Sequence, residues 1–167
     1  MRKLLVWAEY EKYKKYLMTL GKNYCPFCDI QKQIILGKSK HWTWVANIAP
    51  YWRYNILIVP KKHRLDFDEL EMEELIDLQK FYKKIIKHLL SLNLKHTNGK
   101  VMKYFMFMIR TRKYEQIGKN GYNKSNHLHV NLCPDGERIK RFNLDLSAVD
   151  VDIKKISLPQ YKKNKRN

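Results

Sequence analysis

The residues best placed for chemistry are polar side chains that alternate with apolar ones in the segment NHLHVNLC, residues 126–133. Side chains two positions apart on a strand share a face, so we expect His127, His129 and Asn131 to point the same way. The leucines and the valine between them are then expected to enter the core. Two imidazoles and an amide on one exposed face indicate either a reactive site or an ordinary polar strand surface, and the alternation alone leaves both interpretations open.

A second group of candidates begins with two cysteines in the tetrapeptide Cys25-Pro-Phe-Cys28. The chain has three cysteines, too few for a disulfide scaffold, and its N-terminus lacks the apolar stretch of an export signal. We therefore expect a cytoplasmic protein in which this pair serves metal or redox chemistry, or remains as two unligated thiols. His63 and His127 are the candidate partners, since two thiolates and two imidazoles make a tetrahedral zinc site.

Length and composition indicate one globular domain over residues 1–167, with a core at about 22–136, an N-terminal helix within 1–21 and a basic tail at 158–167. Hydrophobic residues make up 44% of the chain, near the globular norm, and no apolar run is long enough to span a membrane. Lys and Arg number 34 against 16 Asp and Glu, so the net charge is +18. This field favours nucleotides or nucleic acid as partners, but a lysine-rich coding bias explains it equally well.

Hydrophobic periodicity predicts an α+β protein with an antiparallel β-sheet, a long helix packed on the sheet and a knuckle at residues 22–28. Before the knuckle we expect a helix over 3–20, and after it a helical turn over 29–36 that ends at Gly37. The remaining expected elements are strands over 41–48, 54–59, 101–110 and 126–133, and a helix from 68 to about 90.

The long helix has two sequence features that predict its start and its buried face. Asp68 followed by Glu71 resembles a capping box with Asp at the cap. Apolar side chains at helical spacing predict one buried stripe. The members of this stripe are Leu75, Leu78, Tyr82, Ile85 and Leu89.

Taken in order, these segments resemble the histidine triad (HIT) superfamily of nucleotide hydrolases and transferases. Cys25-Pro-Phe-Cys28 resembles its N-terminal knuckle, and Ala46-Asn-Ile-Ala-Pro50 resembles the family strand that ends in an acidic residue, an aliphatic one, any residue and proline. Leu57-Ile-Val-Pro-Lys-Lys-His63 resembles the strand-to-histidine segment of the family. The stretch from His127 to Pro134 resembles the signature His-φ-His-φ-His-φ-φ followed by proline.

The resemblance implies a HIT-like fold and a role for each triad position. His129, the middle histidine, would attack the α-phosphorus of a nucleoside or dinucleoside polyphosphate and form a covalent nucleotidyl-histidine. Water, phosphate or another acceptor would then take the nucleotidyl group. Asn131 occupies the third position, where a Gln marks the transferase and phosphorylase branches. Because Asn carries the same amide group, the resemblance favours transfer to an acceptor other than water.

The resemblance also implies ligand-binding residues. Asn47 matches an Asp that binds the ribose hydroxyls, and Tyr54-Asn55 stands where the family has Gly-His. The family phosphate loop is replaced by TRKYEQIGKNGYNKSN, residues 111–126, so phosphate contacts are expected from Asn123, Ser125 and Arg110. In zinc-bearing branches the four ligands of a structural Zn²⁺ correspond to Cys25, Cys28, His63 and His127.

Two other functions remain open at this point. One is an enzyme that processes DNA or RNA ends by the same chemistry. The +18 charge would suit it, and so would aromatic residues on which bases could stack, such as Trp42, Trp44, Tyr51 and Trp52. The other is a non-catalytic module that binds nucleotides or nucleic acid, which the altered triad and the altered phosphate loop would suit. Many members of the family dimerise, and the strand expected at residues 101–110 would support a homodimer unless the N-terminal helix covers the same surface.

Overall fold

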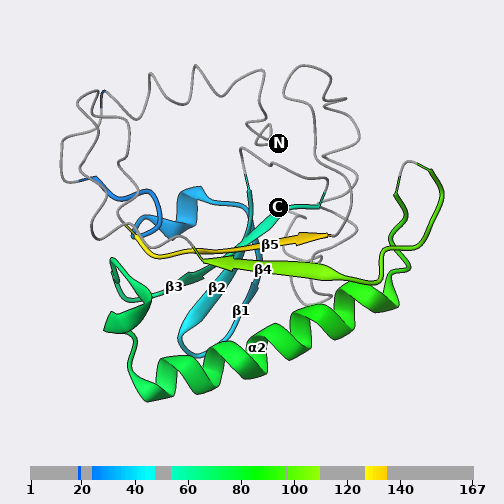
Figure 1. Ribbon diagram of the computed structural model, residues 1–167. Coiled ribbons are helices and arrows are strands. Elements are labelled where there is room, and N and C mark those ends of the chain that lie inside the picture. The colour runs from blue at the N-terminus through cyan, green and yellow to red at the C-terminus, as the bar shows by residue number, and fades with distance from the viewer. Residues whose placement is uncertain (1–18, 20–23, 48–53, 97, 110–126, 135–167) are drawn as a thin grey trace.

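The fold is an antiparallel β-sheet with one long helix packed on it, as the sequence predicted (Figure 1). The computed structural model describes residues 19, 24–47, 54–96, 98–109 and 127–134. Five strands form the sheet in the order β1-β2-β3-β5-β4, and every neighbouring pair is antiparallel. Of the helix expected at 3–20 only residue 19 is described, and it is helical; the tail at 158–167 lies outside the described residues.

The element bounds follow the expected segments, with shorter strands. The strands are β1 Ile35–Lys38, β2 Trp42–Ala46, β3 Ile56–Pro60, β4 Phe105–Ile109 and β5 Val130–Pro134. The long helix is α2 Met72–Ser91, and two short 3-10 helices are η1 Ile30–Lys32 and η2 Phe67–Glu69. Strand β5 lies between β3 and β4, so the histidines that precede it reach the middle of the sheet rather than its edge.

The main core fills the space between the sheet and α2. Alternate residues of the central strands, such as Trp44, Ile58 and Val130, are fully buried on this face. The predicted helix stripe holds at Leu78, Ile85 and Leu89. Leu75 and Tyr82 are only partly buried. The neighbouring positions Glu74 and Phe81 are the buried ones instead.

The start of α2 corrects the predicted capping box. The N-cap is Glu71, and its side chain and that of Glu74 satisfy each other's backbone N–H groups. Asp68 instead belongs to η2, whose first N–H donates to the carboxylate of Asp66. Leu70 has extended backbone angles between the two helices, so a continuous helix from residue 68 is excluded. Asp68 and Glu71 have the same spacing in the sequence as Glu71 and Glu74. The two pairs are distinguished only by the contact that Glu74 makes with another part of the fold.

The segment after the knuckle also differs from the prediction. The expected helical turn over 29–36 shrinks to η1, and the chain then enters β1, which the sequence analysis missed. Gly37 does not stop a helix but pairs with Trp44 within the sheet, where the register shifts between Ile35 and Gly37. A glycine in a short strand with such an irregularity weakens the periodic signal that would have revealed the strand.

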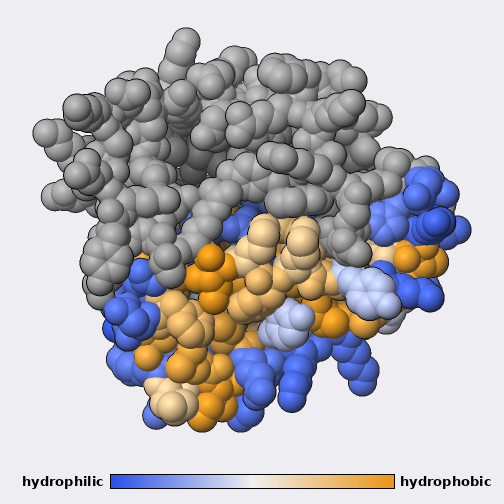
Figure 2. Space-filling view, in the orientation of Figure 1, coloured by the Kyte–Doolittle hydropathy of each residue, from blue (hydrophilic) through white to orange (hydrophobic). Residues whose placement is uncertain are grey.

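The surface along α2 is mixed in character. Hydrophilic and hydrophobic residues both reach the lower edge of the view, where α2 runs in Figure 1 (Figure 2), and the exposed hydrophobic side chains of α2 include Met72, Ile76 and Leu90. Among the described residues, no helix combines the length and the apolar character that crossing a membrane requires. Strand β4 is an edge of the described sheet, the position that the predicted homodimer contact would use.

Removing a buried side chain from α2 tests the core. The change Ile85→Ala is expected to lower the free energy of unfolding by about 2–5 kcal/mol, because Ile85 is fully buried against the sheet. The matched control Lys84→Ala, at the neighbouring exposed position, is expected to change it by less than about 0.5 kcal/mol. Urea unfolding followed by circular dichroism measures both. Equal effects of the two changes would contradict this packing.

Candidate metal centre and nucleotide-binding face

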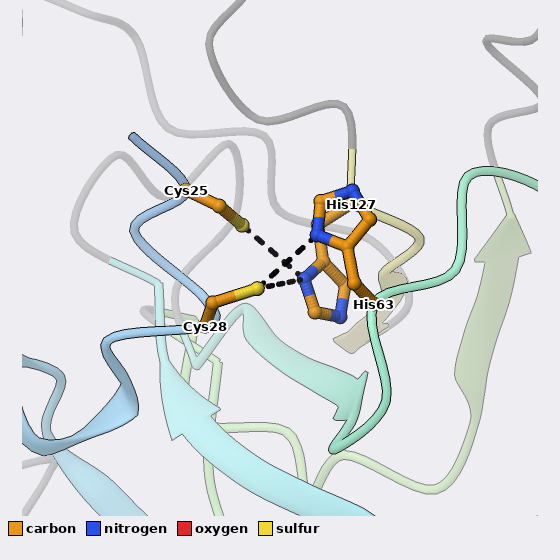
Figure 3. Close-up of side chains that lie close together, drawn as sticks. All are labelled: Cys25, Cys28, His63 and His127. Atoms are coloured by element: carbon orange, nitrogen blue, oxygen red, sulfur yellow. Dashed lines mark hydrogen bonds between the residues drawn. The ribbon is translucent and has the colours of Figure 1, made fainter. Parts of the chain in front are cut away.

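Four residues from distant parts of the chain bring their ligand atoms together (Figure 3). The sulfurs of Cys25 and Cys28 and one nitrogen each of His63 and His127 all lie within 4.8 Å of one another. Cys25 Sγ is 3.3 Å from His127 Nδ1, and Cys28 Sγ is 3.1 Å from His63 Nδ1. The structure therefore gathers the whole set of metal ligands that the sequence analysis named.

The knuckle holds its cysteines by a backbone turn and an aromatic anchor. The carbonyl of Cys25 accepts hydrogen bonds from the N–H groups of Cys28 and Asp29. Phe27, between the cysteines, packs on a small apolar cluster of Val45, Leu57 and Val59. This cluster covers the face of the sheet that α2 does not cover, so the knuckle is fastened to that face.

His127 is the buried member of the group, with 2% of its surface exposed. Its Nε2 lies 3.0 Å from the carbonyl oxygen of Pro60. A carbonyl only accepts, so Nε2 carries the hydrogen and Nδ1 turns its lone pair toward the thiols. Burial lowers the pKa of His127 to about 4, which keeps the ring neutral at physiological pH. A neutral imidazole with one N–H held by a carbonyl is the form that ligates metal.

The two thiols suit a cation at the same point. Partial burial, a hydrogen bond with Cys25 and repulsion between the two thiolates together raise the pKa of Cys28 to about 11. A bound divalent cation reverses this preference, because a coordinating thiol is deprotonated. Two sulfurs and two imidazole nitrogens in one small volume fit the tetrahedral donor set of zinc. The third cysteine, Cys133, is buried elsewhere on the sheet and is not part of the group.

Arg64 connects the metal group, which is the cluster of Cys25, Cys28, His63 and His127, to the start of α2. The sequence analysis missed this arginine. Its guanidinium bonds to the fully buried carboxylate of Glu74 and to Glu71. These hydrogen bonds raise the pKa of Arg64. Its backbone carbonyl accepts from Leu128 N at 2.6 Å, between the two histidines. An acidic residue on the apolar stripe of a helix is the signal that would have predicted a buried cationic partner.

His129 lies next to the metal group, with its orientation set by the backbone. Its Nδ1 is 3.0 Å from the carbonyl oxygen of His127, so Nδ1 donates and Nε2 carries the lone pair. The ring of Phe27 lies against it, with the ring centroids 5.4 Å apart. Nitrogen Nε2 is therefore the atom of His129 that can act as a base or a nucleophile.

The alternation in this segment is as predicted, but its polar face is not exposed. Leu128, Val130 and Leu132 enter the main core. His127 and Asn131 are themselves buried, and only His129 is partly exposed. The expectation of an open polar face was therefore wrong: His127 and Asn131 are buried, and Phe27 of the knuckle packs against the rings of His127 and His129.

The proposed ribose residue, Asn47, lies just after β2 on this same face. Its Nδ2 donates to Oδ1 of Asn55 at 2.7 Å, and both side chains are buried. The other end of Asn55 lies beside the carbonyl of Leu132 and the sulfur of Cys133. The expected phosphate contacts Asn123, Ser125 and Arg110 lie outside the described residues.

The sheet order, the Cys/His group and the histidines before β5 together define a histidine triad fold. The family model that matches the chain is the HIT domain, over residues 29–137. Because this match covers more than half of the chain, the protein belongs to the HIT domain family. A comparison with curated protein sequences yields no match.

Solved structures share this fold at low sequence identity. A zinc-bound histidine triad protein from Mycobacterium smegmatis is 17% identical, with a TM-score of 0.54 over 81% of this chain and 95% of that one. The diadenosine triphosphate hydrolase of Plasmodium falciparum is 18% identical, with a TM-score of 0.52 over 93% and 99%. A uridylyltransferase mutant is 19% identical, with a TM-score of 0.58 over 89% and 52%. At these identities the likeness shows that this chain shares their fold.

The buried His127 predicts a pH dependence of stability in the metal-free protein. Its pKa is about 4 in the folded chain and about 6.5 when exposed, so between these values the unfolded chain binds more protons. Lowering the pH from 6.5 toward 4 should therefore reduce the free energy of unfolding. The variant His127→Gln should lack this part of the dependence. Urea unfolding at pH 7 and pH 5 with chelator measures it, and identical pH slopes in the two proteins would refute the assignment.

Proposed function

We propose that this protein is a nucleotidyl hydrolase or transferase that acts on nucleoside or dinucleoside polyphosphates through a covalent intermediate on His129. The observation that carries the proposal is the hydrogen bond from His129 Nδ1 to the backbone carbonyl of His127. It holds the ring in the tautomer whose Nε2 can attack phosphorus. The membership of the HIT domain family supports the same chemistry.

The proposed reaction has two displacement steps at one phosphorus. The lone pair of His129 Nε2 forms a bond to the α-phosphorus, while the bond from that phosphorus to the bridging oxygen breaks and the leaving phosphate takes the electron pair. Water, phosphate or another acceptor then attacks the same phosphorus, loses its proton and releases the nucleotide from Nε2. Arg110, Asn123 and Ser125 are the proposed contacts to the phosphates, and Asn47 is the proposed contact to the ribose.

Asn131 affects which leaving groups this proposed enzyme can use. It lies two positions after His129, with its amide buried. An amide donates and accepts hydrogen bonds but does not titrate, so it cannot deliver a full proton to the leaving group. Leaving groups that are stable as anions, such as pyrophosphate or a nucleoside polyphosphate, are therefore the favoured ones.

We also propose that Cys25, Cys28, His63 and His127 hold one structural zinc ion. Four protein ligands leave no open position for substrate, so the ion would stabilise the fold and would not take part in the reaction. It would join the knuckle, the segment after β3 and the segment before β5. The zinc-bound histidine triad protein from Mycobacterium smegmatis shares the fold and supports this reading.

Zinc content tests the metal proposal with a matched pair of cysteine variants. Purified wild-type protein should carry about one zinc per chain, and Cys28→Ser should carry much less and unfold at a lower temperature. Cys133→Ser, which changes a buried thiol away from the group, should keep its zinc. Elemental analysis of the dialysed proteins decides. Equal zinc in both variants would eliminate the site.

Product analysis tests the nucleophile. With diadenosine tetraphosphate or another nucleoside polyphosphate, His129→Ala should lose turnover by on the order of 10³-fold or more. Asn131→Gln should retain turnover, because it keeps an amide. Acid-free quenching and mass spectrometry should detect one nucleotidyl group on His129 in the wild type. Undiminished turnover by His129→Ala would overturn the proposal.

The net charge of +18 favours a second candidate, an enzyme of the same chemistry that acts on DNA or RNA ends, or a module that only binds them. Binding to a nucleic-acid end should weaken steeply with salt, because phosphate contacts release counterions. A small nucleotide makes fewer such contacts and should show a shallow salt dependence. Affinities measured at two salt concentrations therefore separate these candidates from the first.

A further inference from the structure

The charges around α2 are separated along the chain. Residues 66–77, which end within the second turn of α2, hold seven Asp and Glu and no Lys or Arg. Residues 78–109 hold seven Lys and no Asp or Glu. Four of these lysines are exposed at helical spacing on α2, and we call them the lysine face: Lys80, Lys83, Lys84 and Lys87. The other three are also exposed and follow the helix, at Lys95, Lys100 and Lys103.

Among the described residues, no acidic side chain forms an ion pair with the lysine face. The acidic residues at the start of α2 pair instead with Lys40, Lys62 and Arg64. Side chains three and four positions apart on a helix are neighbours, so each lysine of the face is repelled by two others. This repulsion weakens the helix, and an anion bound from outside would remove it.

Neither the helix dipole nor a coding bias accounts for the lysine face. The dipole favours a cation only within the last turn of a helix, and Lys80, Lys83 and Lys84 all precede the last turn of α2. A coding bias adds lysine throughout a chain, but it does not remove Asp and Glu from residues 78–109. The separation of charge therefore indicates an anionic partner for this end of α2.

We propose that the lysine face binds the phosphate backbone of a single-stranded nucleic acid. The four lysines extend about 10 Å along the helix axis, a length over which one strand of B-form DNA carries about three phosphates. Next to them, Phe107 of β4 is 39% exposed. Its ring packs against that of Tyr82 on α2, with the centroids 5.2 Å apart. Unpaired bases stack on exposed aromatic rings, so this pair favours a single strand over a duplex.

Two other occupants fit this surface less well. A second copy of the chain, packed by two-fold symmetry, would bring one lysine face against another. A helix that lies in a membrane surface inserts its apolar side, but the apolar side of α2 already packs on the sheet. The exposed Met72 and Ile76 lie near the acidic start of the helix, where anionic lipids would be repelled.

The lysine face and His129 lie on opposite sides of the sheet. Helix α2 packs on one side, and the knuckle, whose Phe27 contacts His129, lies on the other (Figure 1). A strand bound at the lysine face leaves the surroundings of His129 open. This proposal is therefore independent of the reaction proposed for His129, and replacing these lysines should leave nucleotide turnover unchanged.

Fluorescence polarisation with a labelled circular single-stranded DNA of about 30 nucleotides measures this binding. A circle has no end, so a site that takes strand ends cannot account for its binding. The double variant Lys83→Gln/Lys87→Gln removes two charges from the lysine face. It should bind about 10-fold more weakly at low salt. The slope of log affinity against log salt should become shallower by about 1.4, because two phosphate contacts worth about 0.7 each are lost.

The matched control is Lys38→Gln/Lys40→Gln, which removes the same two charges from exposed positions near the acidic start of α2. It should bind the circle within about 2-fold of the wild type. Circular dichroism reports whether both double variants keep the helix. Equal weakening by the two double variants would show a general charge effect and overturn the proposal.

Three further outcomes decide between this proposal and its alternatives. No binding of the circle by the wild type overturns it. Tighter binding to vesicles that contain phosphatidylserine than to the circle also overturns it and assigns the lysine face to a membrane surface. If the wild type binds the circle but turns over no nucleoside polyphosphate, the proposed function fails and this proposal stands.

Discussion

The arrangement of the site depends on the ring of His127, which is held at both nitrogens. One nitrogen donates to the carbonyl of Pro60 at the end of β3, and the other faces the thiols of the knuckle. Its backbone carbonyl in turn fixes the tautomer of His129. A single buried side chain thus joins three segments that are far apart in sequence and also orients the neighbouring reactive ring. Because the ring is neutral when buried, a cation between the thiols and the imidazoles meets no opposing charge from it.

The sheet order makes this convergence a consequence of topology. Strand β5 inserts between β3 and β4, so the residues before β5 run beside the residues after β3. A hydrogen bond from the Leu128 N–H to the Arg64 carbonyl joins these two segments. The guanidinium of Arg64 in turn bonds to the buried carboxylate of Glu74 on α2. Burying one carboxylate is tolerable because a bidentate cation satisfies it. The helix start and the metal group therefore support each other through one residue.

The sequence predicted the fold class, the long helix and four of the five strands, because alternation and helical periodicity report which side of an element is buried. It missed β1, whose four residues include Gly37 at a break in register. It placed the capping box three residues early, because Asp68 and Glu71 have the same spacing as Glu71 and Glu74. It named the four residues of the metal group, but not Arg64 or the hydrogen bond between Asn47 and Asn55. Those depend on contacts across the fold that no local pattern encodes.

The absence of carboxylates from the sheet has a consequence for the ligand. None of the five strands contains Asp or Glu, and the buried polar side chains on the face of His129 are amides, an imidazole and the hydroxyl of Thr43. A buried amide costs less to desolvate than a buried carboxylate once its hydrogen bonds are made, as Asn47 and Asn55 make theirs. An anionic phosphate on this face would meet no charge repulsion from the strands.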